Sequence, residues 1–95
     1  MNNQTMHLAN NDVCIISYAR TPIGSFGGKL SKFSATQLGT FAIRGALQRS
    51  QIKPSAIDEV YLGNVLSGNL GQAPARQAAL GAGIPFSVPC TTINK

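Results

Sequence analysis

The most reactive side chains in this sequence are two thiols and one imidazole, those of Cys14, Cys90 and His7. None stands in a Cys-x-x-Cys motif or a Cys/His cluster, so their spacing predicts no metal site and no disulfide framework. Each cysteine lies in an apolar, β-branched run, where a thiol usually serves as a small packing side chain. We therefore predict that neither cysteine is a nucleophile, and two unpaired thiols suit a reducing compartment.

Two adjacent carboxylates, Asp58 and Glu59, could act together as a general acid and base. They immediately precede the run Val60-Tyr61-Leu62, which predicts a strand. Neighbouring residues of a strand point to opposite faces, so the two carboxylates cannot converge on one substrate atom. We expect them to be solvated residues at the entrance of the strand.

The sequence has two glycine-bearing loops, residues 20–28 and 67–74, and the first is a candidate for phosphate binding. In the first loop, Gly24, Gly27 and Gly28 do not match G-x-G-x-x-G, and no Gly-Lys-Ser/Thr sequence follows. The spacing favours a loop that needs positive φ angles over a loop that holds a nucleotide.

The net charge of +5 arises from eight basic and three acidic residues in a chain of 95. Proteins that bind nucleic acid gather basic residues on one face, commonly with aromatic residues between them. Here the basic residues are scattered, so nucleic acid is not an expected partner. They are Arg20, Lys29, Lys32, Arg44, Arg49, Lys53, Arg76 and Lys95.

The N-terminal residues 1–11 contain no Lys or Arg and no apolar core, so they predict a disordered tail and neither a secretory signal nor a transit peptide. No apolar run approaches the roughly 20 residues that span a bilayer. The composition, 43% hydrophobic and 12% charged, is typical of one globular unit, which we expect over residues 12–95. We expect a cytoplasmic location and no membrane partner.

The elements that must position these residues form an alternating pattern. Residues 13–19 are apolar on both faces, as in a strand covered on both sides by helices. A capping box at Ser34 and Gln37 predicts the start of a helix that ends before Pro54. We expect one stripe of this helix to cover the sheet: Leu38, Phe41, Ala42, Gly45, Ala46 and Arg49.

A second strand is predicted at residues 60–62, and Pro74 suits the first position of a helix over residues 75–80. A third strand is predicted in the last run, residues 88–95, which is rich in β-branched side chains. The chain therefore predicts an α/β fold, β-α-β-α-β, with parallel strands whose carboxyl ends share one edge, where such sheets place ligands.

Four segments together resemble the N-terminal part of a thiolase, most closely that of the cytosolic, biosynthetic acetyl-CoA acetyltransferases. The segments follow one another at family spacing over nearly all of the chain from Asp12 onward. They are residues 19–28 (ARTPIGSFGG), 59–66 (EVYLGNVL), 71–78 (GQAPARQA) and 91–95 (TTINK).

The resemblance implies a thiolase N-terminal domain, incomplete in this chain, with three parallel strands in the order 3-2-1. It also implies a family reaction that joins two acetyl-CoA molecules into acetoacetyl-CoA and CoA through an acyl-cysteine, helped by a second cysteine and a histidine. The CoA thioester is then the substrate, no other cofactor is expected, and the CoA-binding loop lies outside this chain. The full-length enzymes are homo-oligomers, dimers or tetramers.

Thiolases carry their nucleophilic cysteine just beyond the position of Asn94 and Lys95, at a helix N-terminus that lowers the thiol pKa. Cys90 precedes Asn94 and is therefore not that residue, and we expect the chain, truncated before the nucleophile, to be inactive alone. The resemblance implies that Asn94 and Lys95 position the nucleophile and that Gln72 lines the substrate cavity. A polar loop residue without catalytic duty remains the alternative for Gln72.

Two further hypotheses stay open. The chain could be a non-catalytic truncated product that associates with full-length thiolase subunits, because the resemblance places the last strand at the sheet edge that joins two subunits. It could also be a free-standing ligand-binding module, which only the glycine loops favour. We expect Arg20 and Arg76 to be structural, bonding to carbonyl groups or to a partner subunit.

Overall fold

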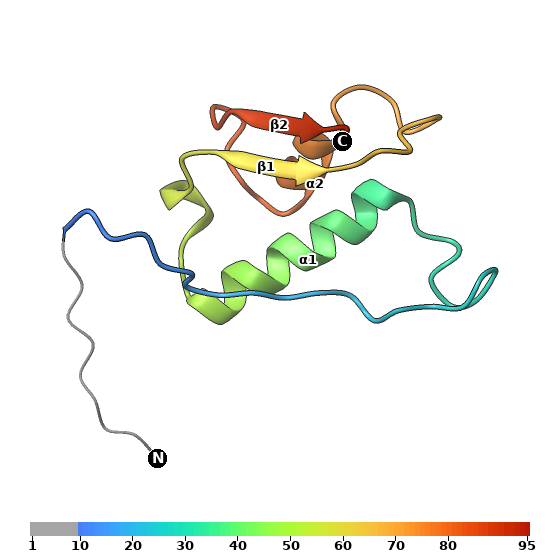
Figure 1. Cartoon of the computed structure of the whole chain (residues 1–95), viewed down its shortest axis with the longest axis horizontal. Helices are drawn as coiled ribbons and strands as arrows, with labels where there is room; N and C mark the ends of the chain where they lie inside the picture. Colours follow the sequence, from blue (N-terminus) through green and yellow to red (C-terminus); the bar gives the residue numbers. More distant parts are fainter. Residues whose placement is uncertain (1–9) are drawn as a thin grey trace, which may run out of the picture.

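A computed structural model describes residues 10–95 of the chain (Figure 1). Its elements are helix α1 (Ala35–Ser50), a short 3-10 helix η1 (Pro54–Ala56), strand β1 (Val60–Gly63), helix α2 (Pro74–Gly81) and strand β2 (Cys90–Ile93). The tail expected at residues 1–11 lies almost wholly outside the described residues.

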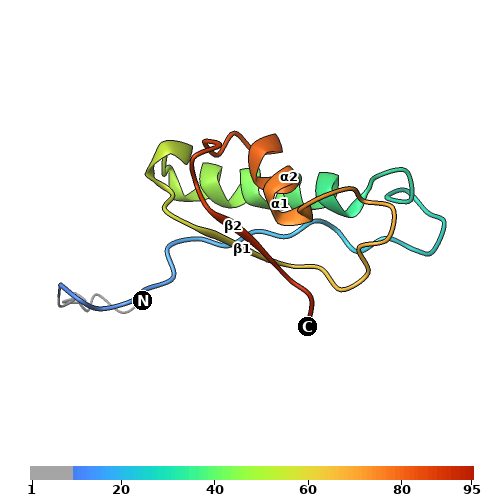
Figure 2. The same cartoon turned by 90° about the horizontal axis from the view of Figure 1, so that it is seen from above.

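The sheet of the described region has two parallel strands joined through α2, as the sequence predicts for residues 60–62 and 88–95. Val60 lies opposite Cys90, and Gly63 lies opposite Ile93. Parallel neighbours need a crossover connection, and α2 supplies it. Both helices lie on the same side of the two strands, with α1 alongside α2 (Figure 2).

Helix α1 begins as its capping box predicts. The hydroxyl of Ser34 accepts from the backbone amide of Gln37, and the Gln37 side chain accepts from the amide of Ser34, at 3.2 and 2.8 Å. The predicted stripe was only partly right, because Ile43 and Leu47, outside it, are the α1 side chains that pack against the core.

The core is small and built largely from alanine. Ala75, Ala78 and Ala79 of α2 are fully buried, and Ala79 packs with Ile84 and Val88. Such short side chains let α1 approach closely: a Cβ added at Gly39 would lie 3.2 Å from the Cβ of Ala78. Polar groups also join the two helices, through Thr40 bonded to the Ala78 carbonyl and Arg44 to the Gly81 carbonyl.

The predicted first strand, residues 13–19, is not a strand, so the expected three-stranded sheet in the order 3-2-1 is wrong for this structure. The segment is extended and runs beside α1 (Figures 1 and 2). A hollow of about 440 Å³, lined by Ile15 and Ser17 on one side and Val60 and Tyr61 on the other, lies between it and β1. Its own anchors are on α1, where Arg49 bonds to the Tyr18 carbonyl and Ala19 lies against Gly45. The segment therefore forms no ladder with β1.

Candidate functional site

The carboxyl ends of β1 and β2 meet at one edge of the sheet, where α/β folds bind ligands. The backbone amide of Asn64, directly after β1, donates to the carbonyl of Ile93 at 2.9 Å. The amide of Ala75, in the first turn of α2, donates to the hydroxyl of Thr92 at 3.0 Å. These two bonds join both strand ends and the start of α2 at one corner, which is the candidate site.

The loop between β1 and α2 is held in this corner by one side chain. The amide nitrogen of Gln77 donates to the carbonyl oxygens of Leu70 and Gln72, both at 2.7 Å. Gly71 has a φ of +81°, and a Cβ there would lie 3.2 Å from the same nitrogen. A glycine at this position therefore allows the loop to fold over Gln77, so the local sequence fixes the loop's shape.

The three residues that the resemblance singled out all lie around this corner. Gln72 is exposed just before α2, and its backbone is fixed by Gln77 while its side chain makes no hydrogen bond to another described residue. Asn94 and Lys95 are exposed and directly follow β2. No hydrogen bond joins these three side chains within residues 10–95, so the structure brings their elements together without linking the groups themselves.

Sequence reasoning missed Asn64 at this corner. Its Oδ1 atom is buried and has no hydrogen-bond partner within the described region, an arrangement that is costly for a polar atom. The signal available was its place directly after a strand at the carboxyl edge. Gln77 was also missed, because nothing in a helical glutamine predicts that it bonds backward to a loop.

The cysteines and carboxylates that lie away from the corner are not arranged for catalysis. Cys90 is half-buried beside the core and its thiol lies 3.4 Å from the Val88 carbonyl oxygen, which confirms the packing role expected for it. Cys14 is exposed, so the same expectation is wrong for Cys14. Its segment is not a strand of the sheet, so it has no neighbouring strand to help bury it. Asp58 and Glu59 are both exposed, as expected.

The carboxylate of Glu59 accepts a short hydrogen bond from the hydroxyl of Tyr61. This bond, followed by the negative charge of Glu59, raises the pKa of Tyr61. Both side chains are exposed, and we assign neither of them a catalytic role.

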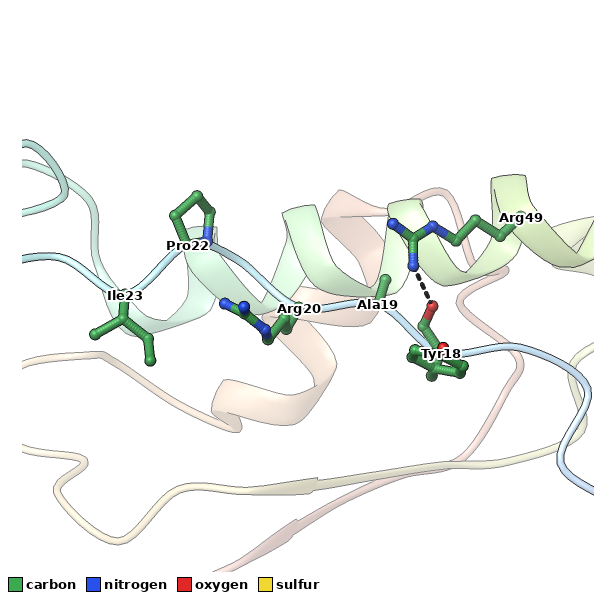
Figure 3. Close-up of a pocket in the computed structure, with 6 residues that line it drawn as sticks. All are labelled: Tyr18, Ala19, Arg20, Pro22, Ile23 and Arg49. Carbon is green, nitrogen blue, oxygen red and sulfur yellow. Dashed lines mark hydrogen bonds between the residues drawn. The ribbon is translucent and has the colours of Figure 1, made fainter.

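A hollow of about 640 Å³ lies between residues 18–23 and Arg49 of α1 (Figure 3). Two guanidinium groups line it, and both bond to backbone carbonyls: Arg49 to Tyr18 at 3.0 Å and Arg20 to Thr21 at 3.1 Å. Arg76 likewise donates to the Phe86 carbonyl at 2.8 Å, so the structural role expected for Arg20 and Arg76 is confirmed. The hollow has cations but neither a nucleophile nor a base.

Within residues 10–95, no group of three or more His, Cys, Asp or Glu side chains could hold a metal ion. None of the helices in that range is long and apolar enough to cross a membrane.

Comparison with known proteins identifies a family that matches nearly the whole described region. Residues 13–95 match the family model described as "Thiolase, N-terminal domain". Acetyl-CoA acetyltransferase 1 of Arabidopsis thaliana is 62% identical over 93% of this chain and 21% of its own length. Acetyl-CoA acetyltransferase of Schizosaccharomyces pombe is 60% identical over 93% of this chain and 22% of its own length.

A solved structure supports the same likeness. The crystal structure of Acat5 thiolase from Ascaris suum in complex with coenzyme A superposes with a TM-score of 0.81 at 48% identity, covering 84% of this chain and 21% of that chain. The chain thus spans about a fifth of the length of the relatives it matches.

Proposed function

The chain belongs to the thiolase family through its N-terminal domain, and from this premise we propose that it forms the leading part of the catalytic scaffold of an acetyl-CoA acetyltransferase. The observation that carries the proposal is the hydrogen-bonded corner at the carboxyl ends of β1 and β2, in a chain 62% identical to such an enzyme over 88 residues. The substrate of the complete enzyme would be acetyl-CoA, and the product acetoacetyl-CoA with release of CoA.

In this proposal the corner presents groups to the reaction without reacting itself. Asn94 and Lys95 leave β2 at a fixed point, because Ile93 is bonded to Asn64, and so they position the cysteine nucleophile of the complete enzyme. Gln72 lines the substrate cavity from a loop whose backbone Gln77 holds. A loop fixed in this way loses little conformational entropy when substrate binds.

None of the cysteines among the 95 residues meets the requirements of the acyl carrier. A reactive thiol needs a helix N-terminus or a neighbouring base to lower its pKa. Cys90 lies within β2 beside a carbonyl oxygen, and Cys14 lies in the extended segment before α1. We therefore propose that these residues supply scaffold and that the acyl-transfer groups belong to other parts of a complete thiolase.

The alternative function is that of a non-catalytic subunit that associates with full-length thiolases. One observation favours it: β2 pairs only with β1 within the described sheet, so the backbone groups of its other edge are open to another strand. An open strand edge is a template for pairing with another chain. Homo-oligomers of the complete enzyme would use the same edge.

We propose a cytoplasmic location, supported by 61% identity to the cytosolic enzyme of Gibberella zeae. Mitochondrial relatives, such as that of Rattus norvegicus at 58% identity, are similar enough that fractionation of cells is the direct test.

An activity assay of the purified 95-residue chain tests the scaffold proposal. We expect no thiolysis of acetoacetyl-CoA above the rate of buffer with CoA, and no acetyl group on Cys14 or Cys90 by mass spectrometry after incubation with acetyl-CoA. Turnover by the isolated chain, or acetylation of Cys90 faster than of free cysteine, would contradict the proposal.

A further inference from the structure

Asn64 carries a buried polar atom that no described residue satisfies. Its carboxamide oxygen, Oδ1, is buried, and no hydrogen-bond donor reaches it from residues 10–95. A buried acceptor without a partner is costly, and folded proteins supply a partner for the great majority of such atoms. The unpaired oxygen therefore indicates a donor that comes from outside the described chain.

The position of Asn64 places this oxygen on the inner side of the corner. Leu62 faces the helices, because it lies against Gly39 of α1. Side chains two residues apart share one face of a strand, so the half-buried Asn64 continues this inward row past the end of β1. On the neighbouring strand Thr92, opposite Leu62, turns its hydroxyl to the amide of Ala75 at the start of α2.

The backbone of Asn64 also marks the path of the chain that leaves β2. Its amide donates to the carbonyl of Ile93 at 2.9 Å, which extends the pairing of the two strands one residue beyond β1. Asn94 and Lys95 follow directly, so the chain leaves the sheet beside Asn64. The backbone amides that come next in a complete enzyme are therefore the donors that the sheet itself leads toward the unpaired oxygen.

We propose that Asn64 is a positioning residue of the complete enzyme, and that its carboxamide oxygen accepts a hydrogen bond from a backbone amide of the segment that follows Lys95. This inference rests on the function proposed above, in which that segment carries the cysteine nucleophile. The bond fixes the backbone of the nucleophile without touching the substrate. The thiol needs such placement, because the helix termini and cations that lower a thiol pKa act only over a short distance.

A chimera tests the inference in a complete enzyme. The 88 aligned residues of acetyl-CoA acetyltransferase 1 of Arabidopsis thaliana are replaced by those of this chain, with and without Asn64→Leu, which removes the acceptor and keeps the size of the side chain. We expect Asn64→Leu to lower kcat for thiolysis of acetoacetyl-CoA about tenfold while KM stays within about twofold. We also expect the pH dependence of inactivation by iodoacetamide to move toward that of free cysteine, because the thiolate is the species that reacts.

Ser17→Ala in the same chimera is the matched control, because Ser17 Oγ is also a buried oxygen without a hydrogen-bond partner in the described region. We expect Ser17→Ala to leave kcat and the pH dependence unchanged. In the isolated 95-residue chain, Asn64→Leu should not lower the urea concentration at the midpoint of unfolding, since no hydrogen bond of Oδ1 is lost there.

The outcomes separate this inference from the function on which it rests. A folded, correctly assembled chimera without turnover, with Asn64 intact, overturns the proposed function and this inference with it. An active chimera in which Asn64→Leu changes neither kcat nor the pH dependence overturns the inference alone, as does an equal effect of Ser17→Ala. If the leucine variant does not assemble, Asn64→Ala, which adds no bulk, takes its place and the same outcomes apply.

Discussion

At the scale of single residues, the candidate site depends on hydrogen bonds that position backbone. The side chain of Gln77 holds the carbonyls of Leu70 and Gln72, and the backbone amide of Asn64 holds the end of β2. The residues that the resemblance named, Gln72 and Asn94, lie next to these anchors and make no side-chain hydrogen bond in the described region. Sequence motifs thus locate the site, whereas the anchors that shape it emerge only from three-dimensional contacts.

The residue-scale prediction concerns the exposed pair Tyr61 and Glu59. Because Glu59 accepts the phenol hydrogen bond and carries negative charge, it raises the pKa of Tyr61 from its ordinary value of 10.0. The bond therefore favours folding at pH values below the pKa of the unfolded tyrosine, and this contribution is lost as the pH rises through the higher folded pKa.

Absorbance titration in a Tyr18→Phe chain, which leaves Tyr61 as the remaining phenol, measures this shift. We expect Glu59→Gln to lower the pKa of Tyr61, because the charge is removed while the shape is kept. Asp58→Gln, at the neighbouring exposed position, is the control and should change the pKa much less. An unchanged Tyr61 pKa in Glu59→Gln would show that the pair does not form in solution.

At the scale of elements, much of the fold could be predicted from local signals. The capping box fixed the start of α1, and Pro74 fixed the start of α2, because both act within one helical turn. The strand over residues 13–19 could not be judged in this way. Strand formation depends on a partner's ladder bonds, which no pattern within one segment contains, and here the segment is anchored on α1 instead. The α1 stripe was misjudged because contacts of Ile43 and Leu47 depend on where α2 and β2 lie.

The element-scale prediction is that Gly81→Ala weakens the contact between α1 and α2. Alanine favours helix by about 1 kcal/mol over glycine, but the added Cβ would lie 2.6 Å from the hydroxyl of Thr40, which is bonded to the Ala78 carbonyl. Overpacking of this kind costs about 1–3 kcal/mol. We therefore expect a net loss of unfolding free energy, measured by urea denaturation with far-UV circular dichroism.

Gly68→Ala is the matched control, since no atom lies within 4 Å of an added Cβ there. In a double variant, Thr40→Ala should remove the clash, so that Gly81→Ala costs less in that background than in the native one. Equal costs in both backgrounds would rule out the clash as the cause.

At the scale of the whole molecule, the chain is a thiolase N-terminal portion with a small core and extensive exposed apolar surface. Its buried hydrophobic residues are few and mostly alanines, and its exposed ones include Val13, Ile15 and Phe26. The part that similarity covers, about a fifth of the matched enzymes, includes the corner at the sheet edge. In the function proposed above this part supplies scaffold, and the scaffold can be tested by itself.

The most direct test of this account is a chimera. The 88 aligned residues of the Arabidopsis thaliana acetyl-CoA acetyltransferase 1 are replaced by those of this chain, and kcat/KM is measured for thiolysis of acetoacetyl-CoA. We expect the chimera to stay within about tenfold of the parent enzyme and to keep that activity when Cys90 is changed to alanine. A folded, correctly assembled chimera without turnover, or one that Cys90→Ala inactivates without unfolding, would contradict the claim that these residues provide scaffold and no reacting group.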